Sequence, residues 1–204
     1  MAYDADLSFN FICRTKIVFG TGSLREAPIE MAALGGTRVL LVTDPGVVKL
    51  GLAKRVEEAL GQGSGGMHAG TFSDVPSDSS IDTIERGAAY GREVKADAIV
   101  SVGGGSAIDT AKGIAICLST GHRLIEHEGA NTLSKRLIPH VVIPTTAGTG
   151  SEVTFAAVIK DAEKHRKILF VDWFLIPDTA ILDPELTVGL PPTLTAATGM
   201  DALT

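Results

Sequence analysis

The feature that most constrains the fold is an apolar, strand-length run that passes through consecutive glycines directly into a helical pattern. The run is 98–102, the glycines are Gly103, Gly104 and Gly105, and the helical pattern covers 106–118. An apolar run without polar alternation is typical of a strand that is covered on both faces in a parallel sheet. Glycines at such a junction let backbone N–H groups and the positive end of the helix dipole face an anion. The pattern therefore predicts a buried strand that ends at a phosphate-binding turn.

This glycine turn carries neither of the two standard nucleotide fingerprints. It lacks the spacing G-x-G-x-x-G of dinucleotide-binding turns and the spacing G-x-x-x-x-G-K-[ST] of P-loops. The structural alternative is an ordinary tight turn in which Ser106 and Asp109 only cap the helix. From these residues alone both interpretations stay open.

Strands and helices alternate along most of the chain. Further strands are expected at 9–19 (one strand or a hairpin), 37–43, 67–72, 137–143, 155–160 and 165–172, and further helices at 24–34, 47–60, 80–95 and after Pro192, with a flexible loop at 61–66 and an irregular segment at 121–136. Short glycine-rich joints between strands and helices are typical of right-handed crossovers in a parallel sheet. We therefore predict an α/β fold with a doubly wound, Rossmann-like parallel sheet.

Composition and charge exclude several classes of protein. The chain has 204 residues, 45% of them hydrophobic, so it can bury a core without disulfides or a structural metal. The formal net charge is −6 and no basic run occurs, so we expect no nucleic-acid partner. The chain has two cysteines, Cys13 and Cys117, no signal-peptide pattern and no apolar stretch of membrane-spanning length. We therefore expect a cytoplasmic protein with no membrane partner.

A second polar motif follows the strand expected at 137–143. Residues 144–152 read Pro-Thr-Thr-Ala-Gly-Thr-Gly-Ser-Glu, so nearly all are small or hydroxylic. Such a loop can hydrogen-bond a ligand through hydroxyls and amides, as the nicotinamide side of a dinucleotide requires. An ordinary turn with helix caps is the alternative. A nucleophilic role for Ser151 is excluded, because no G-x-S-x-G elbow surrounds it and no histidine is evidently placed to activate it.

Asp44 is a third candidate, directly after the strand expected at 37–43. An acidic residue at the carboxyl end of a strand can accept hydrogen bonds from both ribose hydroxyls of an adenosine and repel a 2′-phosphate. That arrangement would select NAD over NADP. Alternatively, Asp44, Pro45 and Gly46 simply form a turn, and without the other motifs the turn would be the preferred interpretation.

Four separated motifs, in order along the chain, carry a resemblance to a known family. They are Asp44; the turn Gly103-Gly104-Gly105-Ser106 with Asp109 and Lys112; the loop 144–152; and the tail from Asp183-Pro-Glu-Leu186 through Leu190-Pro-Pro192 to Thr195-Ala-Ala-Thr-Gly-Met-Asp-Ala-Leu-Thr204. Together they resemble the iron-containing, metal-dependent (group III) alcohol dehydrogenases, and the resemblance covers essentially the whole chain. It implies a dehydroquinate synthase-like architecture, with an NAD-binding α/β domain at 1–190 and the start of an all-helical, metal-binding second domain at 191–204.

The resemblance also implies roles in cofactor binding. Asp44 would hold the adenine ribose, residues 103–106 the diphosphate, and Thr145, Thr146 and Thr149 the phosphate and nicotinamide side; the remaining cofactor-binding candidates are Asp78, Asp109, Ser151 and Lys167. Asp78 marks a departure from the family, which often has Pro-Asn-Pro near the adenine and ribose site where this chain has Val75-Pro-Ser-Asp78. A second carboxylate there would make NADP still less favoured.

The metal site would draw on Asp201, which matches the family's metal-binding aspartate. The other three ligands in the family are histidines further along the chain, and the first of them would be residue 205. We therefore expect a divalent metal, Fe2+ or Zn2+, in the complete enzyme, inactivity of these 204 residues alone, and no catalytic base among them. His127, between Glu126 and Glu128, is not expected to bind metal, because adjacent side chains point apart.

The implied activity is hydride transfer between NAD and a small alcohol, aldehyde or hydroxy acid at a divalent metal. The resemblance further suggests a homodimer or larger assembly, with strands near 9–19 at the interface. Two alternatives stay open from the residues: a non-catalytic nucleotide-binding module, and a related sugar-phosphate or dehydroquinate-type enzyme on the same architecture.

Overall fold

The computed structural model of the chain describes residue 8, residues 12–61 and residues 66–204. The strands are β1 (Lys16–Phe19), β2 (Val39–Val42), β3 (His68–Phe72), β4 (Ala98–Gly103), β5 (Gly129–Ala130), β6 (His140–Pro144), β7 (Ala156–Asp161), β8 (Arg166–Val171) and β9 (Thr179–Leu182). The α-helices are α1 (Ala27–Ala33), α2 (Pro45–Lys49), α3 (Leu52–Gly61), α4 (Ile81–Glu93), α5 (Gly105–Thr120) and α6 (Pro192–Leu203). Short 3-10 helices are η1 (Ser23–Glu26), η2 (Leu124–His127), η3 (Trp173–Leu175) and η4 (Pro184–Leu186).

The central sheet has six strands in the order β1-β9-β6-β4-β2-β3. All neighbouring pairs in it are parallel. From β2 the chain moves outward to β3 and then returns across β2 to β4, so the direction of winding reverses between β2 and β4. The predicted α/β fold with a doubly wound, Rossmann-like parallel sheet is therefore confirmed.

The apolar strands of this sheet feed two separate cores. Along β2, Val39 and Leu41 pack into one cluster, whereas Leu40 and Val42 pack into the other. All four residues of β2 are buried, as is every residue of β4. Because successive side chains of a strand point to opposite faces, an unbroken apolar run requires cover on both sides. Each fully buried valine or leucine contributes roughly 1.5–3 kcal/mol relative to an exposed one.

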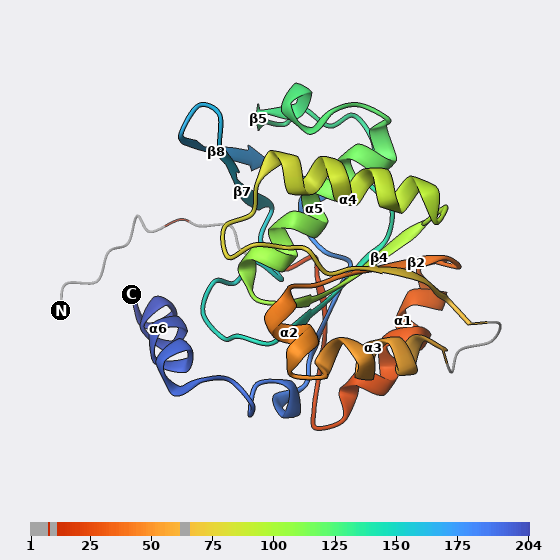
Figure 1. The fold of residues 1–204 in the computed structure, drawn as a ribbon, viewed down its shortest axis with the longest axis vertical. Helices are drawn as coiled ribbons and strands as arrows, with labels where there is room; N and C mark the ends of the chain where they lie inside the picture. Colours follow the sequence, from red (N-terminus) through yellow and green to blue (C-terminus); the bar gives the residue numbers. More distant parts are fainter. Residues whose placement is uncertain (1–7, 9–11, 62–65) are drawn as a thin grey trace.

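Helices supply that cover on both faces. In Figure 1, α1, α2 and α3 lie on one side of the central sheet and α4 and α5 lie on the other. The first group packs into the core of Val39 and Leu41, and the second group packs into the core of Leu40 and Val42. The helix after β2 and the helix after β4 thus lie on opposite faces.

α5 is the most enclosed of these helices. Ten of its sixteen residues are buried, from Ala107 to Cys117, and they contact the sheet, α4 and β7. A helix that is apolar around its whole circumference is typical of a position between layers. Within the described ranges, neither α5 nor another helix is long and apolar enough to cross a membrane.

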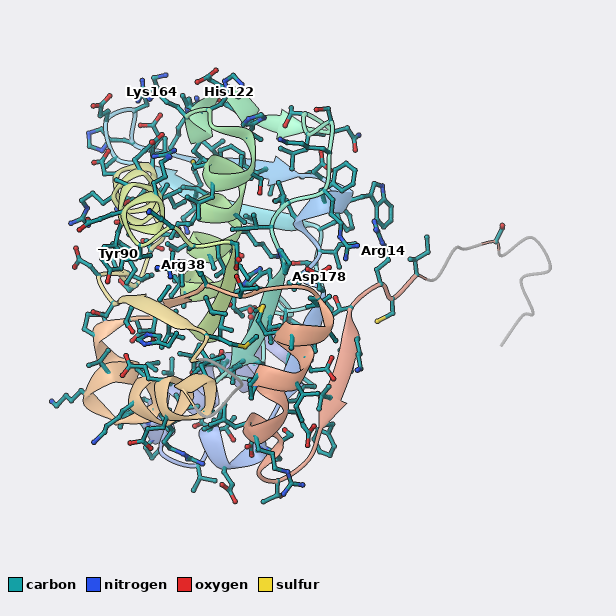
Figure 2. The ribbon with its side chains drawn as sticks, turned by 90° about the vertical axis from the view of Figure 1, so that its right-hand side faces the viewer. Arg14, Arg38, Tyr90, His122, Lys164 and Asp178 are labelled. Carbon is teal, nitrogen blue, oxygen red and sulfur yellow. The ribbon has the colours of Figure 1, made fainter. Side chains whose placement is uncertain are left out.

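A small second sheet lies beyond α4 and α5. It has the order β5-β8-β7, with β7 and β8 antiparallel and β5 and β8 parallel. Figure 2 shows Lys164, in the turn between β7 and β8, at the same end of the molecule as His122, which follows α5. Ile159 and Phe170 join this sheet to the core that also contains α4 and α5. β7 and β8 were predicted as strands, but their assembly into a sheet separate from the central one was not predicted.

One predicted helix is wrong in its extent. The segment 47–60 was expected to form a single helix, but α2 ends at Lys49 and α3 begins at Leu52. Gly51 lies between them with φ 73°, a left-handed conformation that favours glycine and ends a helix. The chain therefore turns where the apolar periodicity alone predicted continuity.

Other boundaries also differ from expectation. β9 was not predicted, because its four residues lie in a segment punctuated by prolines; it forms between β1 and β6. The strand or hairpin expected at 9–19 is a strand only at β1, and residues 9–11 and 62–65, part of an expected strand and an expected loop, lie outside the described residues. The segment 121–136 contains η2 and β5, and β6 begins at His140 rather than at residue 137.

Candidate functional site

The candidate site lies where the carboxyl ends of β2, β4 and β6 meet. The register pairs Val42 with Ser101 and Gly103 with Pro144, so the segments that follow these strands emerge side by side. The chain reverses its winding direction between β2 and β4. In open α/β sheets, ligands bind in the crevice at such a reversal point.

The turn between β4 and α5 offers backbone groups rather than side chains. Gly103 has φ 146°, and Gly104 is the N-cap of α5. The amides of Gly105 and Ser106 donate no hydrogen bond within the described part of the chain. Two N–H groups and the positive end of a 16-residue helix are therefore directed at one place, which suits an anion.

The alternative in which Ser106 and Asp109 cap α5 is wrong. The N-terminus of α5 has no side-chain cap. Instead, the Ser106 hydroxyl donates to the carbonyl of Ser77, and Asp109 Oδ2 accepts a 3.0 Å hydrogen bond from the Val158 amide of β7. Both side chains hold neighbouring segments against α5 and leave its first amides unused.

The loop 144–152 packs closely on this turn. The Thr145 amide donates to the Gly103 carbonyl at 3.0 Å. A Cβ at Gly104 would lie 3.3 Å from Thr146 Oγ1, and a Cβ at Gly105 would lie 3.0 Å from Thr149 Cγ2. The glycines therefore allow the threonine hydroxyls to approach the turn, and larger residues would separate the two segments.

Asp44 has a structural role that can be combined with ligand binding. Its Oδ1 accepts hydrogen bonds from the amides of Gly46 at 2.8 Å and Val47 at 3.0 Å and so caps α2. The turn interpretation of Asp44 is therefore correct for its backbone bonds. Oδ2 lies beside Gly103, where a Cβ would be 3.1 Å from it. The carboxylate consequently stands next to the glycine turn at the mouth of the crevice.

Two clefts open at this edge of the sheet. The first cleft, of about 830 Å³, is lined by the following residues: Asp44, Pro45, Gly46, Val47, Lys49, Leu50, Leu52, Val75, Pro76, Ser77, Gly104, Gly105, Ser106, Ala107, Thr145, Thr146, Thr149, Leu190, Pro191, Leu194 and Thr198. The second cleft, of about 320 Å³, is lined by Asp78, Ser79, Gly105, Ser106, Asp109, Thr149, Ser151, Val158, Lys160, Lys167 and Asp201. The volume of the first cleft is that of an ordinary cofactor pocket.

The structure brings the residues singled out in the sequence together. Asp44, Gly104, Thr145 and Thr146 line the first cleft. Asp78, Asp109, Ser151, Lys167 and Asp201 line the second. Gly105, Ser106 and Thr149 line both, so the clefts are joined at the N-terminus of α5. Gly103, the first glycine of the turn, lines neither of the two clefts.

Asp109 combines burial with an unused oxygen. Burial raises the pKa of its carboxyl group, although the Val158 amide, the Lys112 ammonium and the nearby Ser151 hydroxyl lower it. Its Oδ1 is buried and has no hydrogen-bond partner among the described residues. A buried acceptor without a partner costs free energy. Asp109 Oδ1 could therefore accept a hydrogen bond from a donor of a ligand in the second cleft.

Lys167 and Asp78 both line the second cleft and form an ion pair with each other. Their charged atoms are 3.7 Å apart, and the side chains are 66% and 56% exposed. An exposed ion pair of this kind contributes about 0–1 kcal/mol to stability, so a charged ligand could replace it.

Asp201 is exposed in α6 at the rim of the second cleft. Within residues 12–61 and 66–204, no three or more histidine, cysteine or acidic side chains gather as a metal site. A catalytic divalent ion in a protein takes three or more protein ligands. The residues present therefore do not complete a metal site, and Asp201 offers one carboxylate.

Several lining residues were not singled out by sequence reasoning. Leu190 and Leu194 form apolar walls of the first cleft, and Val75 and Pro76 lie nearby. Lys160 reaches the second cleft because it pairs with Lys167 across β7 and β8. The signal for Lys160 was present, since the two expected strands are joined by a short turn, but their register was not assigned.

α6 touches the loop 144–152 through a glycine, and this contact gives a test. A Cβ at Gly148 would lie 2.4 Å from the Thr198 carbonyl oxygen, whereas a Cβ at Gly199 would meet nothing within 4 Å. We expect Gly148→Ala to displace α6 and to speed amide hydrogen exchange in residues 192–203, at a cost of about 1–3 kcal/mol. Gly199→Ala should slow exchange, because alanine favours a helix by roughly 0.5–1 kcal/mol over glycine. Exchange in Gly148→Ala as slow as in the unmodified chain would contradict the contact.

Known proteins resemble this chain over nearly all of its length. A family model described as iron-containing alcohol dehydrogenase matches residues 14–184. Alcohol dehydrogenase 4 of Schizosaccharomyces pombe is 40% identical over 187 residues, covering 92% of this chain and 44% of that protein. 4-hydroxybutyrate dehydrogenase of Cupriavidus necator is 41% identical over 198 residues, covering 95% of this chain and 50% of that protein. The chain spans about half the length of the curated relatives it matches.

A solved structure with the same fold was crystallised with a dinucleotide. Sulfoacetaldehyde reductase from Bifidobacterium kashiwanohense, in complex with NAD+, superposes with a TM-score of 0.84 at 32% identity. The match covers 96% of this chain and 51% of that one.

Proposed function

The chain belongs to the iron-containing alcohol dehydrogenase family, and we propose that it binds NAD along its two joined clefts. In this proposal the chain is the cofactor-binding portion of an oxidoreductase that transfers a hydride between NAD and a small alcohol, aldehyde or hydroxy acid. The observation that carries the proposal is the pair of unbonded amides, Gly105 and Ser106, at the point where the clefts join.

The diphosphate is the part of NAD that fits those amides. A helix N-terminus with two unused N–H groups favours negative charge, and the glycines before it leave room for close approach to the backbone. The Thr146 and Thr149 hydroxyls lie beside Gly104 and Gly105 and can donate further hydrogen bonds. We infer that the diphosphate bridges the two clefts at this turn.

The adenosine half fits the first cleft. Its apolar walls, which include Val75, Leu190 and Leu194, suit a purine ring. Asp44 stands at the end of β2, where its Oδ2 can accept hydrogen bonds from ribose hydroxyls while Oδ1 keeps the cap of α2. A carboxylate at this place repels a 2′-phosphate, so we infer that the site prefers NAD to NADP.

The nicotinamide half is then assigned to the second cleft. Asp109 Oδ1 is buried without a partner there, and a carboxamide N–H is a suitable donor for it. Thr149, Ser151 and Lys167 supply further polar contacts. When bound, NAD supplies the hydride acceptor, and these residues hold and orient its ring.

The metal and the second domain remain proposals from the family. Asp201 would provide one ligand for Fe2+ or Zn2+, and one carboxylate is too few to hold a catalytic ion. None of the residues of α6 is buried, which supports 191–204 as the start of a second, helical domain after an NAD-binding domain at 1–190. We therefore infer that residues 1–204 alone bind NAD without oxidising alcohols.

Assembly and location are inferred on narrower grounds. β1 is an edge strand of the central sheet, and its Ile17 and Phe19 are 43% and 74% exposed, which supports a homodimer or larger assembly formed at this edge. Cys13 and Cys117 are both free thiols, which supports the reducing cytoplasm.

The proposal is tested by calorimetric titration of the 204-residue chain with NAD and, separately, with NADP. We expect NAD to bind at least about tenfold more tightly, a difference of about 1.4 kcal/mol, because Asp44 repels the 2′-phosphate. A parallel assay for alcohol-dependent NADH formation, with iron or zinc added, should show no turnover. Binding of neither nucleotide would contradict the proposed cofactor site, and turnover would contradict the assignment of the metal ligands.

A further inference from the structure

The outer edge of β7 is held by side chains of α5. β7 is the edge strand of the sheet β5-β8-β7, so one row of its backbone groups has no neighbouring strand. Lys112 Nζ donates to the Ala156 carbonyl at 2.8 Å, and the Val158 amide donates to Asp109 Oδ2 at 3.0 Å. The Lys160 amide donates to the Ser79 carbonyl at 2.7 Å. Two side chains of α5, together with the backbone of the segment before α4, thus complete the edge of this sheet.

Lys112 makes the most extensive of these contacts. It is 1% exposed, and its ammonium also donates to the Thr154 carbonyl at 2.9 Å and to Thr154 Oγ1 at 3.2 Å. An ammonium has three protons, and here it meets three acceptors on one segment. Asp109 lies one helical turn earlier on the same face of α5, and the two side chains bond Val158 and Ala156 of β7, which are two residues apart.

Burial of this ammonium has a cost that the structure offsets only in part. Burial lowers the pKa of Lys112 to about 8, whereas the carboxylates of Asp109 and Glu152 raise it. Transfer of a charge into the interior costs free energy unless hydrogen bonds and opposite charges compensate for it. We therefore infer that Lys112 holds α5 and β7 at a defined separation through its hydrogen bonds, and does not merely fill space between them.

That geometry determines the width of the second cleft. Val158 and Lys160 of β7 line this cleft, and Lys167 of β8 lines it because β8 pairs with β7 at Lys160. The opposite wall is formed by Gly105, Ser106 and Asp109 of α5. The distance between the two walls is therefore the distance at which α5 holds β7. Lys112 itself lines neither the first nor the second cleft.

We propose that Lys112 is a positioning residue, which works with Asp109 as a clamp that holds β7 against α5 and so shapes the second cleft for the nicotinamide half of the cofactor. The inference rests on the proposed function, because it assigns the nicotinamide to the second cleft. It adds that affinity for this half depends on a residue that never touches it. The first cleft is lined by no residue of β7 or β8, so the clamp does not form its walls directly.

Two ligands separate the clamp from a general role in folding. ADP contains only the adenosine and diphosphate parts, so it occupies the first cleft and the turn where the clefts join, whereas NADH also occupies the second cleft. Lys112→Met keeps an unbranched side chain of similar length but removes all three donors. We expect the variant to bind NADH about tenfold more weakly and ADP with unchanged affinity, because the segments that lose their support, Thr154 and β7, do not line the first cleft. Lys112→Arg, which restores donors to the same carbonyls, should recover most of the NADH affinity.

Lys54→Met is the matched control. Lys54 lies on α3, is 78% exposed, and forms only an ion pair with Glu58 at 3.8 Å among the described residues. The Lys54→Met variant should bind NADH and ADP with the same affinities as the unmodified chain. Amide exchange at Val158 and Lys160 gives a readout without ligand, and it should speed up about tenfold or more in Lys112→Met alone.

The outcomes distinguish the clamp from the function on which it rests. If the unmodified chain binds neither NADH nor ADP, the proposed function fails, and exchange at Val158 and Lys160 still decides whether Lys112 holds β7. If the unmodified chain binds both but Lys112→Met binds NADH equally well, the clamp is overturned. An equal loss of NADH and ADP affinity would also overturn it, since Lys112 would then support the whole domain.

Discussion

Gly103→Ala is expected to abolish detectable NAD binding and to lower the free energy of unfolding by about 2–4 kcal/mol. Gly103 has φ 146°, a conformation that a residue with a Cβ rarely adopts. The added Cβ would also lie 2.8 Å from Ala107 Cβ and 3.1 Å from Asp44 Oδ2. Relief of these contacts must move the turn away from α5 or move Asp44, and either movement disperses the groups proposed to hold the diphosphate and ribose.

The measurement combines urea unfolding with calorimetric titration of NAD. Gly121→Ala is a suitable control, because Gly121 ends the same helix with φ 78° and a Cβ there would meet nothing within 4 Å. That variant should lose about 1 kcal/mol of stability from backbone strain and keep its NAD affinity. If Gly103→Ala bound NAD as tightly as the unmodified chain, the glycine turn would not be the diphosphate site.

The second large effect is expected for Asp44→Asn, which should shift the preference between NAD and NADP by about 100-fold towards NADP. Asparagine keeps an oxygen that can accept from the Gly46 and Val47 amides, so α2 retains its cap. The substitution removes the negative charge that repels a 2′-phosphate and one acceptor for the ribose hydroxyls. NAD affinity should therefore fall while NADP affinity rises.

Two further variants separate charge from structure. Asp74→Asn changes the net charge equally, at an exposed ion pair with Arg86 that lies outside both clefts, and should leave the preference unchanged. Asp44→Ala removes both the cap and the charge, so it should also lose about 1 kcal/mol of stability. Titrations of NAD and NADP with each variant give the ratio directly. An unchanged ratio in Asp44→Asn would place the ribose elsewhere.

The parts of the fold that could be read from the sequence are those with a local physical signal. β2 is an unbroken apolar run, β4 is apolar except for Ser101 and the final glycine, and α5 follows glycines with a mostly apolar pattern. Such segments must be buried on both faces, which leaves few architectures besides a parallel sheet between helices. β9 has no such signal: it has four residues among prolines and becomes a strand because β1 and β6 provide hydrogen-bond partners on both sides.

The residues of the candidate site also separate into those that could be placed from the sequence and those that could not. Asp44, Gly103 and Thr145 follow three parallel strands, and the carboxyl ends of parallel strands meet at one edge, so their proximity could be predicted before the strand order was known. Lys160 could not be placed, because its position depends on the register of β7 with β8 and on the docking of β7 against α5. Lys112 was visible only as part of a motif, with no role attached.

The sequence by itself determined the class of the fold, the glycine turn and the order of the polar motifs, because burial, backbone freedom and strand polarity are properties of short segments. Only the tertiary structure decided which faces meet: that the two clefts join at Gly105, Ser106 and Thr149, and that a buried ammonium on α5 holds β7. Those features depend on contacts between residues more than 40 positions apart, such as Lys112 and Ala156. Such contacts contribute free energy only after the layers have packed, so they cannot be recognised from patterns within short segments of the sequence.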